Sequence, residues 1–221
     1  MSIFIKNNIK DMYLAGADTM ADDLFGNLAD NTCWYALVNS DKKSYLITGA
    51  STGEGKTTVA VNLAIHIAKM DKKVLLIDAN LRNPSLGKIF DTGDFPGLTQ
   101  IMCNQIAPSD AIYKVNGYNF HLITSGKIEH EPSKVLTSSR MKDFLGKAKE
   151  VYDFIIIDSP AVNSYLDPLL LCPLVDEVVF VVMADKTEKS EVFIAKAKIL
   201  DAGGKILGVI LNRINSIFFI S

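Results

Sequence analysis

Short apolar runs alternate with longer segments of mixed polarity from residue 44 onward. Six of these runs are rich in β-branched residues and have the length of strands: residues 45–48, 73–77, 120–123, 154–157, 178–182 and 207–211. Their apolar character is almost continuous, which is typical of strands covered by helices on both faces. The pattern therefore predicts an α/β fold of three layers, with a mainly parallel central sheet flanked by helices.

Two of the connections between these runs have the length and composition of helices. One covers about residues 56–70 and the other about residues 187–202. Gly203 and Gly204 follow the second segment, and glycine is favourable just past the C-terminus of a helix. We therefore expect both segments to be crossover helices that pack against the sheet.

The first 43 residues differ from the rest of the chain, because they mix acidic and small residues without a clear period. We interpret residues 1–43 as a helical N-terminal arm and residues 44–221 as one domain. A chain of 221 residues, 48% of them hydrophobic, is long enough to bury one large core. The apolar residues 217–220 are interpreted as a packed final strand, in preference to a membrane-binding or partner-binding tail.

Charge and cysteine content restrict the partners and the compartment. The formal net charge is -2, with 23 basic and 25 acidic residues mixed along the chain, so we do not expect a nucleic-acid partner. Cys33, Cys103 and Cys172 are far apart and form no C-x-x-C pair, which is typical of isolated thiols in a reducing compartment. The apolar run at the N-terminus is too short for a signal peptide. These features predict a cytoplasmic protein.

A glycine-rich segment lies between the first predicted strand and the first predicted helix, where residues 48–58 read TGASTGEGKTT. Its register matches a phosphate-binding loop, G-x-x-x-x-G-K-[ST], with Ala50 in place of the first glycine. In such a loop, backbone N–H groups curl around phosphate oxygens, and the following helix directs its positive N-terminus at them. The matching glycines, lysine and threonine favour this interpretation over an ordinary glycine-rich turn.

The loop supplies the candidate nucleotide contacts. Lys56 is expected to reach the terminal phosphates, and Thr57 is expected to bind Mg²⁺. The predicted ATP-binding residues of the loop are Thr52, Gly53, Glu54, Gly55, Lys56, Thr57 and Thr58. The motif therefore predicts ATP and Mg²⁺ as cofactors.

Two aspartates follow apolar strands directly, at positions where parallel sheets bind ligands. Asp158 follows the run at 154–157 and fits the Walker B role, in which a carboxylate helps to hold Mg²⁺. Asp78 follows the run at 73–77 and is predicted to complete the metal shell or to receive an acceptor's proton. Alone, either aspartate could instead cap the next helix. Beside a phosphate loop we favour the metal role and expect both carboxylates to converge on Lys56.

Two further residues have alternative interpretations. Arg82 either neutralises phosphate charge or pairs with a surface carboxylate, since guanidinium geometry suits both. Asn212 leaves the last predicted strand, where its amide either reads an adenine edge or belongs to a turn.

At this point the sequence resembles the bacterial tyrosine kinases of capsule and exopolysaccharide synthesis. The resemblance covers roughly residues 44–212 and adds three segments to the phosphate loop. Residues 76–84, LIDANLRNP, resemble the family's Asp-x-Asp-x-Arg-x-Pro motif, and residues 152–160, YDFIIIDSP, resemble its Walker B segment. Ser125-Gly126 with residues 132–136, and Asp167 downstream, complete the pattern. Together these motifs are specific, whereas a phosphate loop alone would fit many NTPases.

The resemblance implies a P-loop NTPase fold and a tyrosine-protein kinase that binds Mg·ATP. It implies Lys56, Asp78 and Asp158 as catalytic residues, with Thr57, Asp78 and Asp158 as metal ligands. It also favours ATP-binding roles for Arg82 and Asn212. The partners implied are protein tyrosines, neighbouring copies of the chain, and a membrane-bound polysaccharide co-polymerase that recruits the protein to the inner face of the membrane.

Three features depart from the family pattern. Asn80 stands where the family has its second aspartate, and an amide cannot act as a base. The chain has no tyrosine after Tyr165, whereas the family ends in clustered tyrosines, and residues 1–43 contain no arginine for the family's oligomerisation motif. A nucleotide-gated regulatory module with weakened catalysis is therefore an alternative. A Min/Par-type switch ATPase is a second alternative, which Ser51 argues against because that class carries a signature lysine there.

Overall fold

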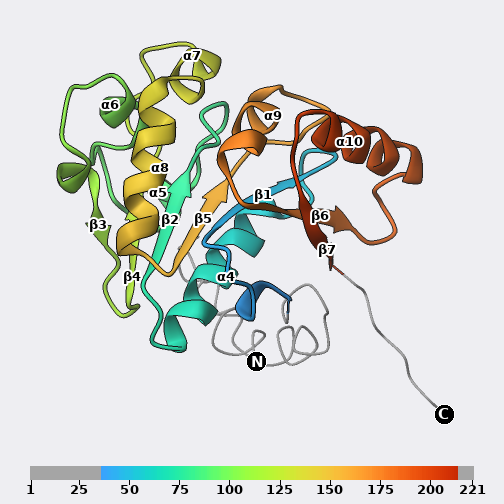
Figure 1. Ribbon diagram of the computed structural model, residues 1–221, viewed down its shortest axis with the longest axis horizontal. Coiled ribbons are helices and arrows are strands. Elements are labelled where there is room, and N and C mark those ends of the chain that lie inside the picture. The colour runs from blue at the N-terminus through green and yellow to red at the C-terminus, as the bar shows by residue number, and fades with distance from the viewer. Residues whose placement is uncertain (1–35, 214–221) are drawn as a thin grey trace, which may run out of the picture.

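Seven strands form one sheet in the computed structural model, which describes residues 36–213 (Figure 1). The spatial order of the strands is β3-β4-β2-β5-β1-β6-β7. Every neighbouring pair is parallel except β3 with β4. The strands are β1 (Ser44–Gly49), β2 (Val74–Asp78), β3 (Tyr113–Lys114), β4 (Phe120–Ile123), β5 (Phe154–Asp158), β6 (Glu177–Met183) and β7 (Ile206–Asn212).

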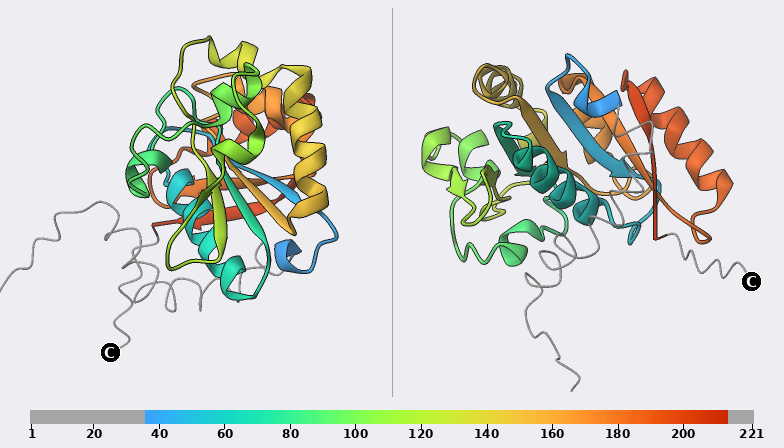
Figure 2. Two further views of the ribbon diagram at one scale, coloured as in Figure 1. Left: turned by 90° about the vertical axis from the view of Figure 1, so that its left-hand side faces the viewer. Right: turned by 90° about the horizontal axis from the view of Figure 1, so that it is seen from below.

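Helices cover both faces of this sheet (Figure 2). The α-helices are α4 (Lys56–Lys69), α5 (Leu86–Ile89), α6 (Leu98–Met102), α7 (Pro132–Leu136), α8 (Ser139–Val151), α9 (Asp167–Leu171) and α10 (Lys189–Asp201). Two short 3-10 helices are η2 (Pro108–Ala111) and η3 (Cys172–Leu174). Within residues 36–213, none of the helices is long and apolar enough to cross a membrane.

Alternate residues of the strands pack into two separate hydrophobic cores, one on each face of the sheet. In β1, Tyr45 and Ile47 pack into the core that contains α4, whereas Leu46 packs into the core that contains α8 and α10. This division follows from strand geometry, because successive side chains point to opposite faces. Both faces are covered, which explains why the strands are apolar throughout. The predicted three-layer fold with a mainly parallel sheet is confirmed.

The six predicted strands and both predicted helices are present, with small differences at their ends. Gly203 follows α10 with a φ of 80°, the left-handed conformation expected after a helix. Helix α10 begins at Lys189 and not at Thr187, because the Thr187 hydroxyl takes part in loop contacts described below. The pattern missed β3, which has only two residues.

The packed body extends ahead of the first strand. Leu37 is only 1% exposed and belongs to the core on the α4 side. The Tyr45 hydroxyl donates a 2.9 Å hydrogen bond to the carbonyl of Lys42. Most of the predicted N-terminal arm and the whole apolar segment 217–220 lie outside the described residues, so the division at residue 43 stays a prediction.

The sheet topology brings three strand ends together. β1 lies between β5 and β6, and β5 lies between β1 and β2. Asp78 and Asp158 are register partners, and Asp158 is also the partner of Ile47 in β1. The phosphate loop leaves β1 at this same edge, so the segments with candidate chemistry meet at the carboxyl ends of adjacent parallel strands, where such sheets bind ligands.

Candidate nucleotide-binding site

The phosphate loop connects β1 to α4 and ends in a left-handed residue. Gly55, the residue before α4, has a φ of 88°, which favours glycine. The amide nitrogen of Asn212 lies so close that a Cβ on Gly55 would collide with it. Helix α4 then begins at Lys56 and turns its free N–H groups toward the loop, as an anion site requires.

The Lys56 side chain is only 8% exposed and folds back over the loop. Its ammonium donates a 2.6 Å hydrogen bond to the carbonyl of Ser51 and lies 3.8 Å from Oε2 of Glu54. Burial lowers the pKa of Lys56, while the nearby charges of Glu54 and Asp158 act in the opposite direction. Lys56 is thus a cation held inside the loop by protein oxygens, which phosphate oxygens would have to replace.

Thr57 and Asp158 come together across the site. The Thr57 hydroxyl donates a 2.7 Å hydrogen bond to Oδ2 of Asp158. The other oxygen, Oδ1, is buried and has no hydrogen-bond partner among the residues described. A hydroxyl beside a carboxylate with an unused oxygen is an arrangement that a hard cation such as Mg²⁺ fits. These two side chains could therefore hold the metal.

Asp78 lies beside Asp158 but has a different set of contacts. Its Oδ1 accepts the backbone N–H of Asn80, and its Oδ2 accepts those of Ser85 and Leu86. Asp78 therefore shapes the loop after β2 and ties it to the start of α5, which is the capping arrangement that the sequence left open. Its predicted metal role stays a prediction.

Burial has a strong electrostatic effect on this pair of carboxyl groups. Both Asp78 and Asp158 have no exposed surface. Burial raises the pKa of Asp158 above the usual range, and the charge of Asp78 raises it further. Burial also raises the pKa of Asp78, although its three backbone hydrogen bonds partly offset the effect. A divalent cation would relieve the repulsion between the two charges.

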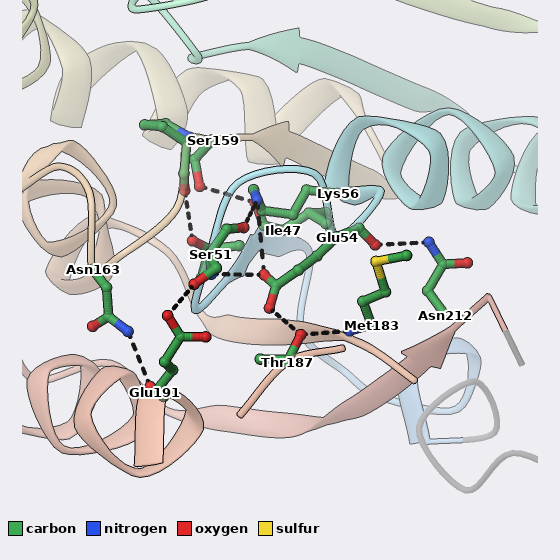
Figure 3. Close-up of polar contacts among 12 residues, drawn as sticks. Ile47, Ser51, Glu54, Lys56, Ser159, Asn163, Met183, Thr187, Glu191 and Asn212 are labelled. Atoms are coloured by element: carbon green, nitrogen blue, oxygen red, sulfur yellow. Dashed lines mark hydrogen bonds and ion pairs between the residues drawn. The ribbon is translucent and has the colours of Figure 1, made fainter. Parts of the chain in front are cut away.

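Glu54 ties the phosphate loop to the segment between β6 and α10 (Figure 3). This carboxylate is 2% exposed, and its Oε2 accepts the backbone N–H of Ser51 at 3.0 Å. Its Oε1 accepts the hydroxyl of Thr187 at 2.9 Å. Burial raises the pKa of Glu54, and the Ser51 and Thr187 hydrogen bonds lower it. The predicted ATP contact of Glu54 can therefore come only from its backbone while this side-chain arrangement persists.

Two more hydrogen bonds join the loop to α10 and β7, and a third joins Asn163 to the same residue of α10. The Ser51 hydroxyl donates to Glu191 at 3.0 Å, and the Asn163 amide donates to the carbonyl of Glu191 at 3.0 Å (Figure 3). The amide of Asn212 donates to the carbonyl of Glu54 at 2.8 Å. In this state Asn212 braces the loop, and the predicted contact with adenine stays a prediction.

A cavity of about 330 Å³ opens above the loop. Of the predicted ATP-binding residues, six line it: Thr52, Gly53, Gly55, Lys56, Thr57 and Thr58. Glu54, Asn212 and Arg82 are not in its lining, and the sequence did not single out the lining residues Asn83, Pro160 and Arg213.

Arg82 pairs with a carboxylate, as the second of its two alternatives had it, but this carboxylate is buried and does not lie on the surface. Its Nε and one terminal nitrogen donate to the two oxygens of Asp167, at 2.8 Å and 3.2 Å. Asp167 is buried, so this fork-shaped contact satisfies a carboxylate that would otherwise be costly to bury. The guanidinium also lies 5.3 Å from the centre of the Tyr165 ring. In this structure Arg82 links the loop after β2 to the segment before α9.

Sequence reasoning missed the residues that brace the loop from a distance. Thr187, Glu191 and Asn163 lie more than a hundred positions beyond the loop and belong to no motif. Asn163 follows a predicted strand, and Thr187 and Glu191 lie in the predicted helix 187–202, but nothing in these patterns connects them to the phosphate loop. In the described part of the chain, no group of three or more His, Cys, Asp or Glu side chains forms a metal cluster, so a cation here would depend on Asp158, Thr57 and the nucleotide.

The fold and this loop define a P-loop ATPase. A family model described as AAA domain (AAA_31) matches residues 44–190. The chain is 34% identical to the putative tyrosine-protein kinase CapB of Staphylococcus aureus over 81% of its own length and 78% of CapB. The chain therefore belongs to the bacterial tyrosine kinase family of P-loop ATPases, which is related to the Min/Par proteins.

Solved structures agree with this assignment. The VpsO kinase domain superposes with a TM-score of 0.81 at 32% identity, covering 90% of this chain and 98% of that domain. The septum site-determining protein MinD of Pyrococcus horikoshii, complexed with Mg-ADP, superposes with a TM-score of 0.65 at 26% identity, covering 79% and 71% of the two chains. The kinase domain is thus more similar than the MinD structure.

Proposed function

We propose that this protein binds Mg·ATP and transfers the γ-phosphoryl group to protein tyrosine, in the control of capsular or exopolysaccharide synthesis and export. The observation that carries the proposal is the hydrogen bond from Thr57, which lines the cavity with Lys56, to the buried Asp158, whose Oδ1 is left without a hydrogen-bond partner in residues 36–213. The tyrosine-kinase names of relatives and the Mg-ADP complex of the MinD neighbour support it.

Each residue has a definite task in this proposal. The N–H groups at the start of α4 and in the loop bind the phosphates, and Lys56 exchanges the Ser51 carbonyl for a terminal phosphate oxygen. Thr57 and Asp158 hold the metal, which neutralises charge that develops on the phosphates. Because phosphoryl transfer needs mainly positioning and charge neutralisation, these groups suffice without a covalent enzyme intermediate.

The family membership also suggests the cellular setting. We propose a cytoplasmic protein that a separate, membrane-bound polysaccharide co-polymerase recruits to the inner face of the membrane and activates. Homo-oligomerisation would bring the tyrosines of one copy to the site of another. A co-purification from membranes with and without the co-polymerase tests this part directly.

The experiment that tests the activity compares three proteins with Mg·[γ-³²P]ATP: the full chain, Lys56→Met and Lys196→Met. Released phosphate and label on tyrosine are both followed. Lys56→Met should lower transfer by about 10²-fold or more, as loss of a charge-stabilising donor does. Lys196 is exposed on α10, so Lys196→Met is the matched control and should keep the full rate.

The same experiment separates the two alternatives. Asn80 lines the cavity and engages its side-chain oxygen with the N–H of Asn83, so it adds no carboxylate there. This favours a nucleotide-gated module as the second candidate, which would bind nucleotide tightly without turnover or label. A Min/Par-type switch would release phosphate without labelling tyrosine. Either result would reject the kinase proposal.

A further inference from the structure

One tyrosine lies within the candidate nucleotide site itself. Tyr165 lines the cavity that Lys56 and Thr57 also line, and it is 40% exposed. It follows β5 by seven positions and stands between Ala161, whose carbonyl accepts its N–H, and the start of α9. The proposed reaction needs a phenolic oxygen near the terminal phosphate, and the chain already carries one at the cavity.

The other tyrosines of the described region are poorer candidates. Tyr45 and Tyr152 are buried, while Tyr113 and Tyr118 are partly buried at the edge of the sheet formed by β3 and β4. None of these four lines the cavity. Of the seven tyrosines in the sequence, only Tyr13 and Tyr35 lie outside the described residues.

Contacts of Arg82 fix the segment that carries Tyr165 against the loop after β2. The ring packs beside Arg82, and Arg82 pairs with Asp167. That loop begins at Asp78, the register partner of Asp158. The segment that carries Tyr165 is therefore joined to the loop that follows Asp78, and Lys56 and Thr57 line the same cavity as Tyr165.

We propose that Tyr165 is an autophosphorylation site that accepts the γ-phosphoryl group from ATP bound to the same chain; this inference rests on the proposed kinase function. The phenolic oxygen forms a bond to the γ-phosphorus, and the bond from that phosphorus to the β,γ-bridging oxygen breaks. ADP leaves with that oxygen, and the phenolic proton goes to a water molecule. The contact with Arg82 limits the rotation of the ring and so lowers the entropy cost of attack.

The test uses the full chain with Mg·ATP at several protein concentrations, followed by mass spectrometry of its peptides. Phosphotyrosine should appear at residue 165 with a rate constant independent of protein concentration, because the transfer is intramolecular. Tyr165→Phe should lose most of the label, whereas the matched change Tyr113→Phe, away from the cavity, should keep it. Mixing active chain with Lys56→Met should leave residue 165 of the inactive chain unlabelled.

A soluble Glu/Tyr copolymer serves as a second acceptor in the same reactions. Labelled copolymer without phosphate on residue 165 would overturn this inference and leave the kinase proposal standing. Label confined to Tyr13 or Tyr35, or a rate constant that rises with protein concentration, would overturn it too. Failure to label either acceptor would reject both proposals together.

Discussion

The hydroxyl of Thr57 donates a hydrogen bond to Oδ2 of Asp158 over 2.7 Å, although the two residues are 101 positions apart. The contact joins the first turn of α4 to the end of β5. It also orients Asp158 so that one oxygen is engaged and the other is left without a hydrogen-bond partner in residues 36–213. Such an orphaned buried oxygen is costly unless a ligand binds it.

Asp158→Asn should weaken Mg²⁺-dependent nucleotide binding by about 10–100-fold, since an amide offers a cation less charge than a carboxylate. Calorimetric titration with ADP, with and without Mg²⁺, measures this. The effect should be confined to the titrations with Mg²⁺. Asp143→Asn, at an exposed position on α8, is the control. Equal loss with and without the metal would contradict a metal role for Asp158.

The stability of the metal-free protein should depend on pH through the same carboxyl pair. Because the pKa values of Asp158 and Asp78 are raised in the folded state, the folded protein binds protons more tightly there than the unfolded chain does. Lowering the pH from alkaline through neutral toward the ordinary carboxyl range should therefore increase the free energy of unfolding, by at most about 1.4 kcal/mol per pH unit for each group.

Urea unfolding at a series of pH values checks this sign. Asp158→Asn should remove much of the slope and should be more stable than the metal-free parent at alkaline pH. Saturating Mg·ADP should also flatten the slope, because ligation requires the deprotonated carboxylate. A parent protein that loses stability over this range would show that the pair is not the dominant titrating site.

The Glu54–Thr187 contact should couple the phosphate loop to the segment before α10. Glu54→Gln replaces one accepting oxygen with an amide N–H group, which faces either the Ser51 N–H or the Thr187 hydroxyl. Thr187→Val removes the hydroxyl that donates a hydrogen bond to Glu54. Each change should cost about 1–3 kcal/mol of unfolding free energy, because buried partners are left unsatisfied. The double variant should cost less than the sum of the two, by about 0.5–3 kcal/mol. Additive costs in urea unfolding would show that the contact is absent in solution.

Arg82→Lys should destabilise the protein although it conserves charge. Lysine cannot reproduce the two hydrogen bonds that Arg82 makes to Asp167, and Asp167 is buried. We expect a loss of about 1–3 kcal/mol in the free energy of unfolding. Arg140→Lys, at an exposed position in the first turn of α8, should change stability by less than about 0.5 kcal/mol. Equal values for the two variants would mean that the Asp167 contact contributes nothing.

The sheet could be predicted from sequence because strands that are buried on both faces are continuous apolar runs in the sequence. The six predicted strands are largely apolar at consecutive positions, and four of them, β1, β2, β5 and β7, end at the phosphate loop, Asp78, Asp158 and Asn212. Strand β3 escaped prediction because two residues, one partly buried and one exposed, form no pattern. Its pairing with β4 depends on where the intervening chain turns, which hydrophobic periodicity does not record.

The site was predictable only where a motif fixes the backbone. The phosphate loop encodes its own conformation through glycine and helix position, so Lys56 and Thr57 were found. Asp78 shows the opposite case, because the same strand-end aspartate can bind a metal or cap a helix, and only the path of residues 80–86 decides which backbone N–H groups reach it. The role of Thr187 could not be predicted, because its hydrogen bond to Glu54 depends on how the fold places a loop 133 positions away.

The burial of Leu37 has a practical consequence for anyone who shortens this chain. A protein that starts at Ser44, where the strand pattern begins, would lose the buried Leu37 from the core on the α4 side of the sheet. It would also lose the Lys42 carbonyl, which accepts a hydrogen bond from the Tyr45 hydroxyl. Removing a buried leucine typically costs about 2–5 kcal/mol, a large share of the stability of an ordinary domain. A fragment meant for crystallisation or binding studies should therefore start upstream of Leu37.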